Sequence, residues 1–233
     1  MKFEAIMFDL FGTLVDDFVS SVCQMNTELA IALGAPVEPF MELWRETAVM
    51  RSAGAFQTVE ASIEHVCAIM GVRVGTEEMN KAVQIRLHYT RRALAPRPNA
   101  LMTLTQLKTL SYKIGLLSNC SIEIPILWPE TPFAHLFDTA IFSSRERLKK
   151  PDPRIYHLAC ERLGVTPASC LYVADGENYE LAAAGKVGLH SVLIRTGSVR
   201  TNSRLHQEAT EWQGPSIATL PEVIQIVSSR LRD

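Results

Sequence analysis

Short, continuous apolar runs, separated by helix-like segments, most constrain how this chain can fold. Five of them are rich in Ile, Val, Leu or Phe, lack a strict apolar–polar alternation and end in polar or small residues: 5–10, 113–117, 139–142, 171–174 and 191–194. Such runs are typical of strands buried on both faces of a parallel sheet. Between them, apolar residues recur at helical spacing, as at Leu101 and Leu104 or at Ile155 and Leu158. The chain therefore predicts an α/β fold with a doubly wound, Rossmann-like parallel sheet.

The segment that follows the first apolar run differs, because it contains no strand-like run. Its apolar residues recur at helical spacing in four stretches, of which the first ends near Gly34 and the last begins near Thr76. Glycine commonly closes helices, and threonine is a favoured helix N-cap. We therefore expect two domains, an α/β core domain and a four-helix cap domain inserted into it, with these bounds: core 1–16 and 93–233, cap 17–92.

The composition narrows the range of partners. The 23 Lys and Arg residues nearly balance the 25 Asp and Glu residues, which leaves a formal net charge of −2 and argues against a nucleic-acid surface built on bulk positive charge. No apolar stretch is long enough to span a bilayer, and the N-terminal residues lack the features of a secretory signal. The five cysteines are scattered, as reduced thiols usually are. We expect a cytoplasmic protein that binds neither nucleic acid nor a membrane, and the sequence leaves open a monomer or a homodimer.

The segment Phe8-Asp9-Leu10-Phe11-Gly12-Thr13-Leu14 carries the strongest chemical signal. Asp9 closes an apolar strand and precedes a Gly-Thr turn, at the sheet edge where open α/β folds bind their ligands. A carboxylate in this place serves as a metal ligand, as a covalent nucleophile, or as both. An aspartate that merely caps a turn is the alternative that this segment alone leaves open.

Three further strand or loop ends carry polar groups suited to the same edge. Ser118 and Asn119 end the second apolar run with a hydroxyl and an amide. Lys150 precedes a proline-stiffened loop that leads into a helix. Asp175 ends the fourth run, and Glu180 follows it by about one helical turn. Counted from Asp9, the four segments supply a carboxylate, a hydroxyl, a cation and a second carboxylate, in that chain order, on strand or loop ends of one sheet.

With these four segments in this order, the chain resembles the haloacid dehalogenase-like (HAD) hydrolase superfamily. The resemblance covers nearly the whole chain, because the helical insert occupies the position of that family's type-1 cap. It implies that Asp9 is a nucleophile that forms an aspartyl intermediate, and that Ser118, Lys150 and Asp175 complete the catalytic set. Hard oxygen ligands suit magnesium, and the resemblance implies a Mg²⁺ ion at the following groups: Asp9, the backbone carbonyl of Phe11, Asp175 and Glu180.

The resemblance also implies a set of substrate-binding residues around the nucleophile. These are Phe11, Gly12 and Thr13 in the first segment, Asn119 in the second, and two arginines of the helical insert, Arg45 and Arg51. The arginines suit either a halide or the anionic tail of a substrate, and solvated positions on helices are the alternative that the sequence leaves open. The expected reaction is Mg²⁺-dependent hydrolysis of a small phosphorylated metabolite through an aspartyl-phosphate at Asp9.

One departure from the family pattern keeps two other functions open. Phosphatases of the family usually carry a second Asp two residues after the nucleophile, where this chain has Phe11. That Asp acts as general acid and base, a role worth about 10²- to 10⁴-fold in rate. Metal-free 2-haloacid dehalogenases tolerate an aromatic residue there, because a halide leaves without a proton. Asp175 argues for a metal instead, since it would repel Asp9 without a cation. A slow or non-catalytic ligand-binding module is the third alternative.

Overall fold

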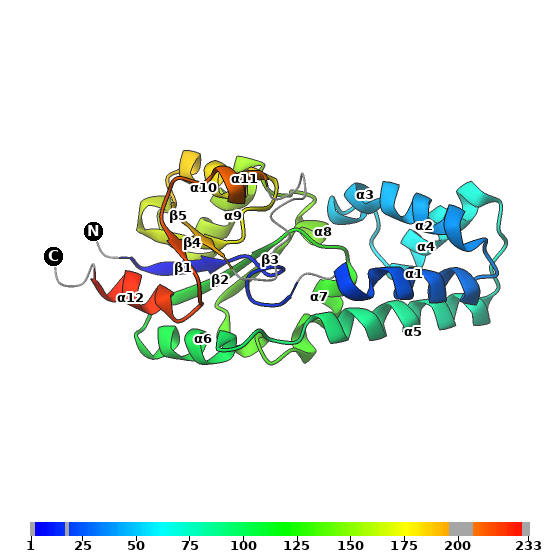
Figure 1. Ribbon diagram of the computed structural model, residues 1–233, viewed down its shortest axis with the longest axis horizontal. Coiled ribbons are helices and arrows are strands. Elements are labelled where there is room, and N and C mark those ends of the chain that lie inside the picture. Colours follow the sequence, from blue (N-terminus) through cyan, green and yellow to red (C-terminus); the bar gives the residue numbers. More distant parts are fainter. Residues whose placement is uncertain (1–2, 17–18, 196–206, 230–233) are drawn as a thin grey trace.

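The computed structural model describes residues 3–16, 19–195 and 207–229 and contains one parallel sheet of six strands (Figure 1). The strand order is β3-β2-β1-β4-β5-β6, and every neighbouring pair is parallel. The strands are β1 (Ala5–Phe8), β2 (Lys113–Ser118), β3 (Thr139–Phe142), β4 (Cys170–Ala174), β5 (His190–Ile194) and β6 (Ser216–Ile217). The α/β, Rossmann-like parallel sheet expected from the sequence is confirmed. β1 lies in the interior of the sheet between β2 and β4, so the residue after it emerges at the centre of one edge.

Helices cover both faces of the sheet (Figure 1). Along β1, Ile6 and Phe8 belong to one buried cluster, and Ala5 and Met7 belong to the cluster on the opposite face. This two-sided burial explains why the strand shows no polar alternation. One face is covered by α6 (Ala100–Thr109) and α12 (Glu222–Ser229), and the other by α9 (Pro153–Leu163), α10 (Glu180–Val187) and α11 (Gln207–Glu211). Shorter elements connect them: α7 (Glu123–Leu127), α8 (Ser143–Glu146), and 3-10 turns at Trp128–Glu130, Ala134–Leu136, Pro167–Ser169 and Glu177–Tyr179.

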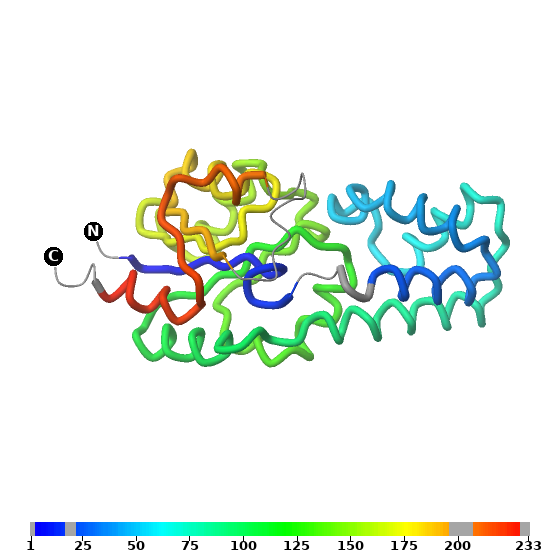
Figure 2. Tube along the Cα trace, viewed as in Figure 1, coloured from blue at the N-terminus to red at the C-terminus, as the bar shows by residue number. Residues whose placement is uncertain are grey.

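The segment after β1 forms five helices at the end of the molecule away from both termini (Figure 1). They are α1 (Val19–Ala32), α2 (Val37–Glu46), α3 (Ala48–Ser52), α4 (Val59–Met70) and α5 (Thr76–Ala93). The helices enclose a buried cluster of their own, which includes Met25, Phe40 and Ile63. Figure 2 shows α1 and α5, far apart in the sequence, running side by side.

Two local features of these helices differ from the sequence-based expectation of four. The second expected helix divides at Thr47, whose hydroxyl donates to the carbonyl oxygens of Leu43 and Trp44. A side chain that bonds to the preceding turn weakens helix continuation. The last helix begins one residue earlier than expected, because Gly75 is its N-cap and Thr76 is its first residue.

Several contacts join the helical segment to the rest of the chain, and two of them lie close to the sheet edge. The Arg86 guanidinium on α5 pairs with the Glu123 carboxylate on α7, and both side chains are buried. The Ser143 hydroxyl at the start of α8 donates to the carbonyl oxygen of Ser52 at the end of α3, at 2.6 Å. These contacts hold α3 and α5 next to the edge of the sheet where Asp9 emerges.

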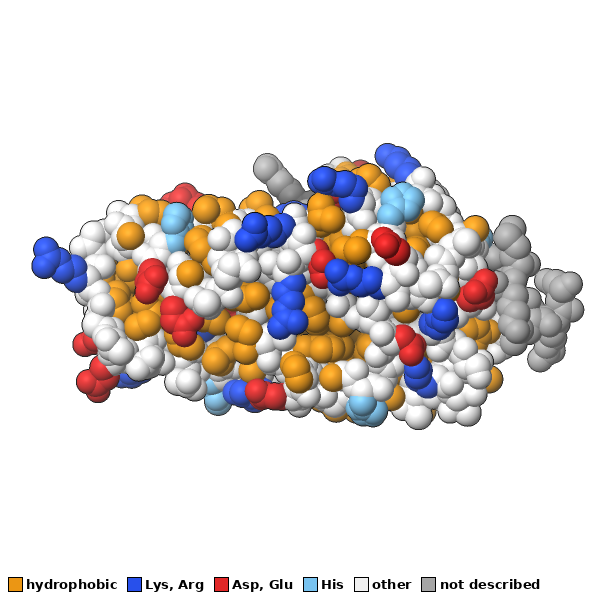
Figure 3. Space-filling view, turned by 180° about the vertical axis from the view of Figure 1, so that it is seen from behind, with side chains coloured by type: hydrophobic (Ala, Val, Ile, Leu, Met, Phe, Trp, Pro, Cys, Tyr) orange, Lys and Arg blue, Asp and Glu red, His pale blue; other side chains and the backbone are white. Residues whose placement is uncertain are grey.

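The surface shows charges of both signs. On the face seen in Figure 3, Lys and Arg side chains lie scattered among Asp and Glu side chains, with hydrophobic side chains between them. Within the described part of the chain, the helices are too short or too polar for any of them to cross a bilayer. All five cysteines are free thiols; four are buried and Cys23 is exposed.

Candidate active site

Asp9 directly follows the central strand β1 and is 6% exposed. Its backbone N–H donates to the carbonyl oxygen of Val173 on β4 at 3.0 Å, which continues the ladder past the end of the strand. The carbonyl oxygen of Leu10 then accepts bonds from the backbone N–H groups of Thr13, Leu14 and Val15. These bonds form the tight turn that the Gly-Thr pair predicts. Asp9 is therefore held at the carboxyl edge of the sheet, as expected.

Gly12 brings the backbone of this turn against Asp175. Its φ of +74° lies in the left-handed region, and a Cβ atom at this position would lie 2.0 Å from Oδ2 of Asp175. A residue with a side chain would thus meet backbone strain and a clash with a carboxylate. Asp175 follows β4, the neighbour of β1, and is 2% exposed. The two aspartates therefore reach one edge from adjacent strands.

Lys150 ties the acidic side chains together. Its Nζ lies 2.5 Å from Oδ1 of Asp9, 2.5 Å from Oε2 of Glu180 and 3.0 Å from the hydroxyl of Tyr172. The side-chain amide of Asn119 fixes the lysine's backbone, because its Nδ2 donates to the Lys150 carbonyl at 3.0 Å and its Oδ1 accepts from the Lys150 N–H at 2.9 Å. Asn119 was expected to bind substrate; in the structure its amide positions the lysine loop, and a direct contact with substrate stays a prediction.

Glu180 is nearly saturated with donors. Its Oε2 accepts from Lys150 and, at 2.6 Å, from the Tyr172 hydroxyl, while its Oε1 accepts from the backbone N–H of Glu177 at 3.1 Å. Direct ligation of a metal by Glu180 therefore stays a prediction that would require these bonds to rearrange. Sequence reasoning missed Tyr172, and a tyrosine inside a buried strand offers no signal beyond packing.

The site carries an excess of buried negative charge. Oxygen atoms of Asp9, Asp175 and Glu180 lie within 4.8 Å of one another, and all three residues are buried. Three carboxylates against one lysine leave a formal charge of −2. Burial raises the pKa of Asp9 well above its ordinary value; Lys150 opposes this shift, and the charges of Glu180 and Asp175 add to it. Burial alone would lower the pKa of Lys150, but Asp9 and Glu180 outweigh burial and raise it.

This arrangement fits a divalent cation. An uncompensated buried charge is costly, and a doubly charged ion would neutralise the formal −2. The available donors are carboxylate and backbone oxygens, which suit Mg²⁺ rather than a softer metal. The three carboxylates that sequence analysis assigned to the metal thus come together, although Lys150 already holds one oxygen of Asp9. Ligation by the Phe11 carbonyl stays a prediction.

Two buried hydroxyls lie in segments close to Asp9. Thr13 is in the turn after Asp9, and Ser118 ends β2, which pairs with β1. Both residues are fully buried, and within the described residues neither hydroxyl has a hydrogen-bond partner. A buried hydroxyl without a partner costs free energy, so both are suited to donate to oxygens of a bound substrate.

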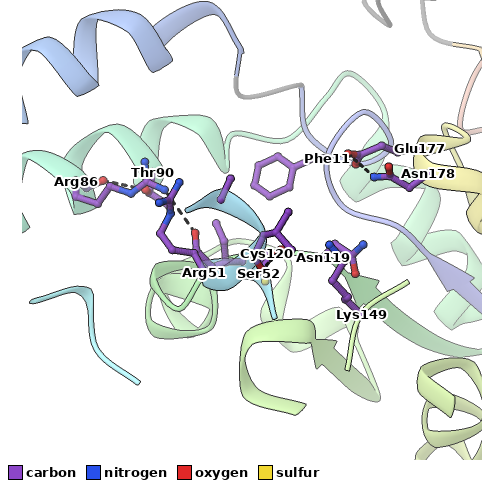
Figure 4. Close-up of a pocket in the computed structure, with 14 residues that line it drawn as sticks. Phe11, Arg51, Ser52, Arg86, Thr90, Asn119, Cys120, Lys149, Glu177 and Asn178 are labelled. Atoms are coloured by element: carbon purple, nitrogen blue, oxygen red, sulfur yellow. Dashed lines mark hydrogen bonds between the residues drawn. The ribbon is translucent and has the colours of Figure 1, made fainter. Parts of the chain in front are cut away.

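A cleft of about 360 Å³ lies beside these groups (Figure 4). Phe11 is in its wall, with Arg51 and Arg86 at one end and Glu177 and Asn178 at the other. Residues from the helical segment after β1 and from the sheet edge thus share one cavity. Asp9 is not among the lining residues, although its neighbour Phe11 is.

The two arginines of the helical segment that were predicted from the sequence to bind substrate, Arg45 and Arg51, lie in different surroundings. Arg51 is 7% exposed and lines the cleft. Arg45 is exposed on α2 and is not among the lining residues. Its role in substrate binding stays a prediction, whereas Arg51 is in a position to reach a ligand. Sequence analysis did not single out Arg86, whose only signal was its place on a helix of the insert.

Comparisons with known proteins agree on one family. A family model described as haloacid dehalogenase-like hydrolase matches residues 3–188. The chain is 30% identical over 200 residues to (S)-2-haloacid dehalogenase 4A of Burkholderia cepacia, covering 82% of each protein. It is also 30% identical over 130 residues to glyceraldehyde 3-phosphate phosphatase of Methanopyrus kandleri, covering 54% of this chain and 56% of that one.

Solved structures include both kinds of enzyme among the similar folds. An L-2-haloacid dehalogenase from Xanthobacter autotrophicus aligns with a TM-score of 0.61 at 20% identity, over 97% of this chain and 98% of that one. A HAD phosphatase from Thermococcus onnurineus aligns with a TM-score of 0.66 at 22% identity, again over 97% and 98%. At these identities the likeness is one of fold.

Proposed function

This chain belongs to the haloacid dehalogenase-like hydrolase family, and on that premise we propose that it is a Mg²⁺-dependent phosphatase of a small phosphorylated metabolite. The observation that carries the proposal is the buried cluster of oxygen donors that includes Asp9, whose three carboxylates and one lysine have a formal charge of −2. A metal-free enzyme would have to keep Asp9 and Asp175 both ionised in one buried site, against their mutual repulsion. With Mg²⁺, the same residues become a set of ligands.

In the first step, a carboxylate oxygen of Asp9 attacks the phosphorus of the ester. The new bond is the aspartyl-phosphate, and the bond from phosphorus to the ester oxygen breaks. Because Phe11 cannot donate a proton, the leaving oxygen takes its proton from solvent water and departs as the alcohol. Asp9, Asp175 and the Phe11 carbonyl would hold Mg²⁺, which when bound offsets the charge on the phosphoryl oxygens. The Lys150 ammonium group orients Asp9, with Nζ 2.5 Å from Oδ1. The hydroxyls of Ser118 and Thr13 donate to phosphoryl oxygens.

In the second step, water attacks the phosphorus of the intermediate. Phosphate leaves, the Asp9 carboxylate is regenerated, and the proton of the water passes to a base. Phe11 cannot serve as that base, so we assign the role to Glu177, whose carboxylate lines the cleft beside Phe11 (Figure 4). Its Oε1 accepts a bond from Asn178 at 3.0 Å, which orients the carboxylate. In the family pattern the base follows the nucleophile by two residues, whereas Glu177 lies in the turn after β4. This assignment therefore predicts slow hydrolysis of the intermediate.

A second candidate function, hydrolysis of an (S)-2-haloacid, is favoured by one specific observation. Phe11 stands where the family's phosphatases have the aspartate that protonates the leaving alcohol. A halide ion needs no proton to leave. In that reaction, Asp9 displaces the halide from carbon, and water then hydrolyses the resulting ester. The similarity to (S)-2-haloacid dehalogenase 4A supports this candidate. We rank it second because Asp9 and Asp175 would then carry like charges in one buried site with no divalent cation to offset their repulsion.

The decisive experiment supplies both substrates to one preparation, with magnesium and with a chelator. We expect phosphate release from an aryl phosphate with Mg²⁺ only, and a loss of at least about 10³-fold in Asp9→Asn. Halide release from a 2-chloro acid in the presence of the chelator would establish the second candidate instead. If the protein releases neither phosphate nor halide, the third alternative, a ligand-binding module, is favoured.

The proposal extends to surroundings and partners. Free cysteines are typical of proteins from a reducing compartment, and this supports a cytoplasmic location. The partner is a small-molecule substrate, because the candidate cleft has a volume of only about 360 Å³. Sedimentation of the purified chain would distinguish a monomer from a homodimer.

A further inference from the structure

Arg51 is a buried cation with most of its hydrogen-bonding capacity unspent. Arg51 is 7% exposed, and its Nη1 donates to the hydroxyl of Thr47 at 2.6 Å. Among the described residues, no carboxylate lies within ion-pairing distance of it. A guanidinium carries five N–H donors in a planar fork, so the Thr47 bond uses only one of them. A buried charge normally has a partner of opposite sign.

The nearest charges leave this end of the cleft positive. Arg86 also lines the cleft, and its Nε pairs with Glu123. Among the residues that the structure describes, these two arginines and this one carboxylate have a formal charge of +1. Burial is the main cause that lowers the pKa of Arg51, and the positive charge of Arg86 lowers it further, against the opposing effect of Glu123. A single negative charge placed here would balance the group.

The shape of the cleft sets this positive end apart from the reacting end. Figure 4 shows Arg51 and Arg86 at one end, Phe11 in the wall and Glu177 at the opposite end. The lining of the cleft also includes the apolar side chains of Val49 and Ile124. A ligand that fills this space would have an anionic group, a short carbon chain, and a second group near the Asp9 edge.

We propose that Arg51 binds a carboxylate of the substrate, so that the preferred substrates are phosphate esters of short hydroxy acids. This inference rests on the proposed function and names its substrate class. A carboxylate matches the planar fork of a guanidinium and brings the single negative charge that the +1 end requires. The two ends of such a substrate then face sites of matching charge, which favours one orientation in the cleft.

Arg51 also has a structural contact that does not depend on a ligand. Its guanidinium carbon lies 4.0 Å from the centre of the Trp44 ring, a cation–π contact that supports the helical cap. Packing against an aromatic ring leaves the in-plane donors available, because they point along the edge of the guanidinium. A purely structural arginine would affect all substrates alike, and this difference provides the test.

The test uses substrates of equal size that differ in one charge. The phosphate esters of hydroxyacetic, 3-hydroxypropanoic and 4-hydroxybutanoic acid are compared with the esters of the corresponding amides, by kcat/KM. For the best-fitting length, we expect the wild-type enzyme to prefer the acid by about 10- to 100-fold. In Arg51→Gln the preference should fall to within about 3-fold, through a higher KM for the acid, with the rate for the amide nearly unchanged. Arg51→Lys, which keeps the charge but loses the fork, should retain a part of the preference.

The control removes an exposed charge from the same cap. Arg92→Gln on α5 should leave the preference unchanged, since Arg92 is exposed. Equal rates for acid and amide in the wild-type enzyme would overturn the inference, as would an Arg51→Gln enzyme that is slower with both. The wild-type comparison holds even if Arg51→Gln does not fold.

Binding separates this inference from the proposed function. Dissociation constants of the same acid and amide are measured by calorimetry with Asp9→Asn protein in the presence of Mg²⁺. Tighter binding of the acid without any phosphate release by the wild-type enzyme would refute the phosphatase and sustain the role of Arg51. Phosphate release with equal binding of acid and amide would refute the role of Arg51 alone.

Discussion

Gly12 links two carboxylates that are far apart in the sequence. Because its backbone lies against Asp175, the turn after β1 and the end of β4 cannot separate or approach without affecting the acidic cluster. We expect Gly12→Ala to displace Asp175, lower the affinity for Mg²⁺ by about 10- to 100-fold and reduce turnover in parallel. Calorimetric titration with Mg²⁺ and a phosphate-release assay measure both effects.

Gly34→Ala is the matched control for this substitution. Gly34 has a φ of +65°, and no atom lies within 4 Å of a Cβ placed there. Both variants therefore carry a similar backbone strain, of about 1–2 kcal/mol, and only Gly12→Ala carries the clash. Equal loss of magnesium affinity in the two variants would contradict the contact with Asp175 as the cause.

Phe11 sets the speed of the second step in our account. Phe11→Asp would place a carboxylate two residues after the nucleophile and supply an acid and base near the ester oxygen. We expect turnover of a phosphate ester to rise by about 10²-fold, and any halide release to remain unchanged. Steady-state rates with Phe11→Leu serve as a control for the loss of the ring. Unchanged turnover in Phe11→Asp would rule out a missing acid and base at this position.

At the level of residues, the sequence predicted the groups that end strands and missed those that act from within them. Asp9 and Asp175 were predictable because polar groups directly after apolar runs meet at one edge of a parallel sheet. Tyr172 was not, since a tyrosine in the middle of a buried strand is normally packing. The clamp between Asn119 and Lys150 joins residues 31 positions apart, a distance over which local patterns carry no information.

At the level of elements, a buried ion pair joins α5 to α7. Glu123 is 3% exposed, and burial would raise its pKa, but the charge of Arg86 and several hydrogen bonds outweigh burial and lower it. A carboxyl with a lowered folded-state pKa stabilises the protein above its unfolded pKa, and this contribution is lost as the pH falls through the folded value. We therefore expect the Glu123 contribution to be complete above about pH 4.5 and to fade below it.

Removal of this carboxylate should be costly. Glu123→Gln leaves Arg86 buried without its anionic partner, and we expect the free energy of unfolding in urea at pH 7 to fall by about 3–5 kcal/mol. The variant should also lose less stability than the wild-type protein as the pH falls below about 4.5, because it lacks the carboxylate whose contribution is lost there.

A nearby exposed pair gives the control. Arg91 on α5 and Glu130, in the turn after α7, are joined at 2.9 Å but are about half exposed. Glu130→Gln should cost no more than about 1 kcal/mol, because solvent screens such a pair. Similar costs for Glu130→Gln and Glu123→Gln would contradict the weight given to burial.

The elements themselves were predictable in proportion to their length and burial. The five longer strands stand out as apolar runs because both of their faces are covered. β6 has only two residues, Ser216 and Ile217, and is too short to form a pattern. The short helix α11 lies in a polar stretch without helical periodicity, so the sequence pattern does not predict it. The break at Thr47 depends on a local side-chain bond rather than on periodicity.

At the level of the whole molecule, the two ends of the cleft region carry opposite charge. The acidic cluster at the sheet edge has a formal charge of −2, and the arginine end near α3 has +1. The first must recruit a cation or protons, and the second an anion. The folded state should therefore gain stability from ligands that bind either end, since a ligand that binds only the native state stabilises it.

Magnesium should raise the thermal stability of the protein. At about 100 times the dissociation constant the gain is about 2.7 kcal/mol, or roughly 5–10 °C for a chain of this size. Asp175→Asn should abolish this shift, yet be at least as stable as the wild-type protein without Mg²⁺, because it removes one buried negative charge. NaCl at equal ionic strength controls for screening. A full magnesium shift in Asp175→Asn would exclude Asp175 as a ligand.

The phosphoryl group on Asp9 is the most direct object of measurement. The enzyme is mixed with an aryl phosphate, quenched in acid within one turnover, digested and analysed by mass spectrometry. Our account predicts a phosphorylated Asp9 peptide when Mg²⁺ is present and none when a chelator replaces it. An unmodified Asp9 peptide during active phosphate release, or equal phosphorylation with the chelator, would contradict it.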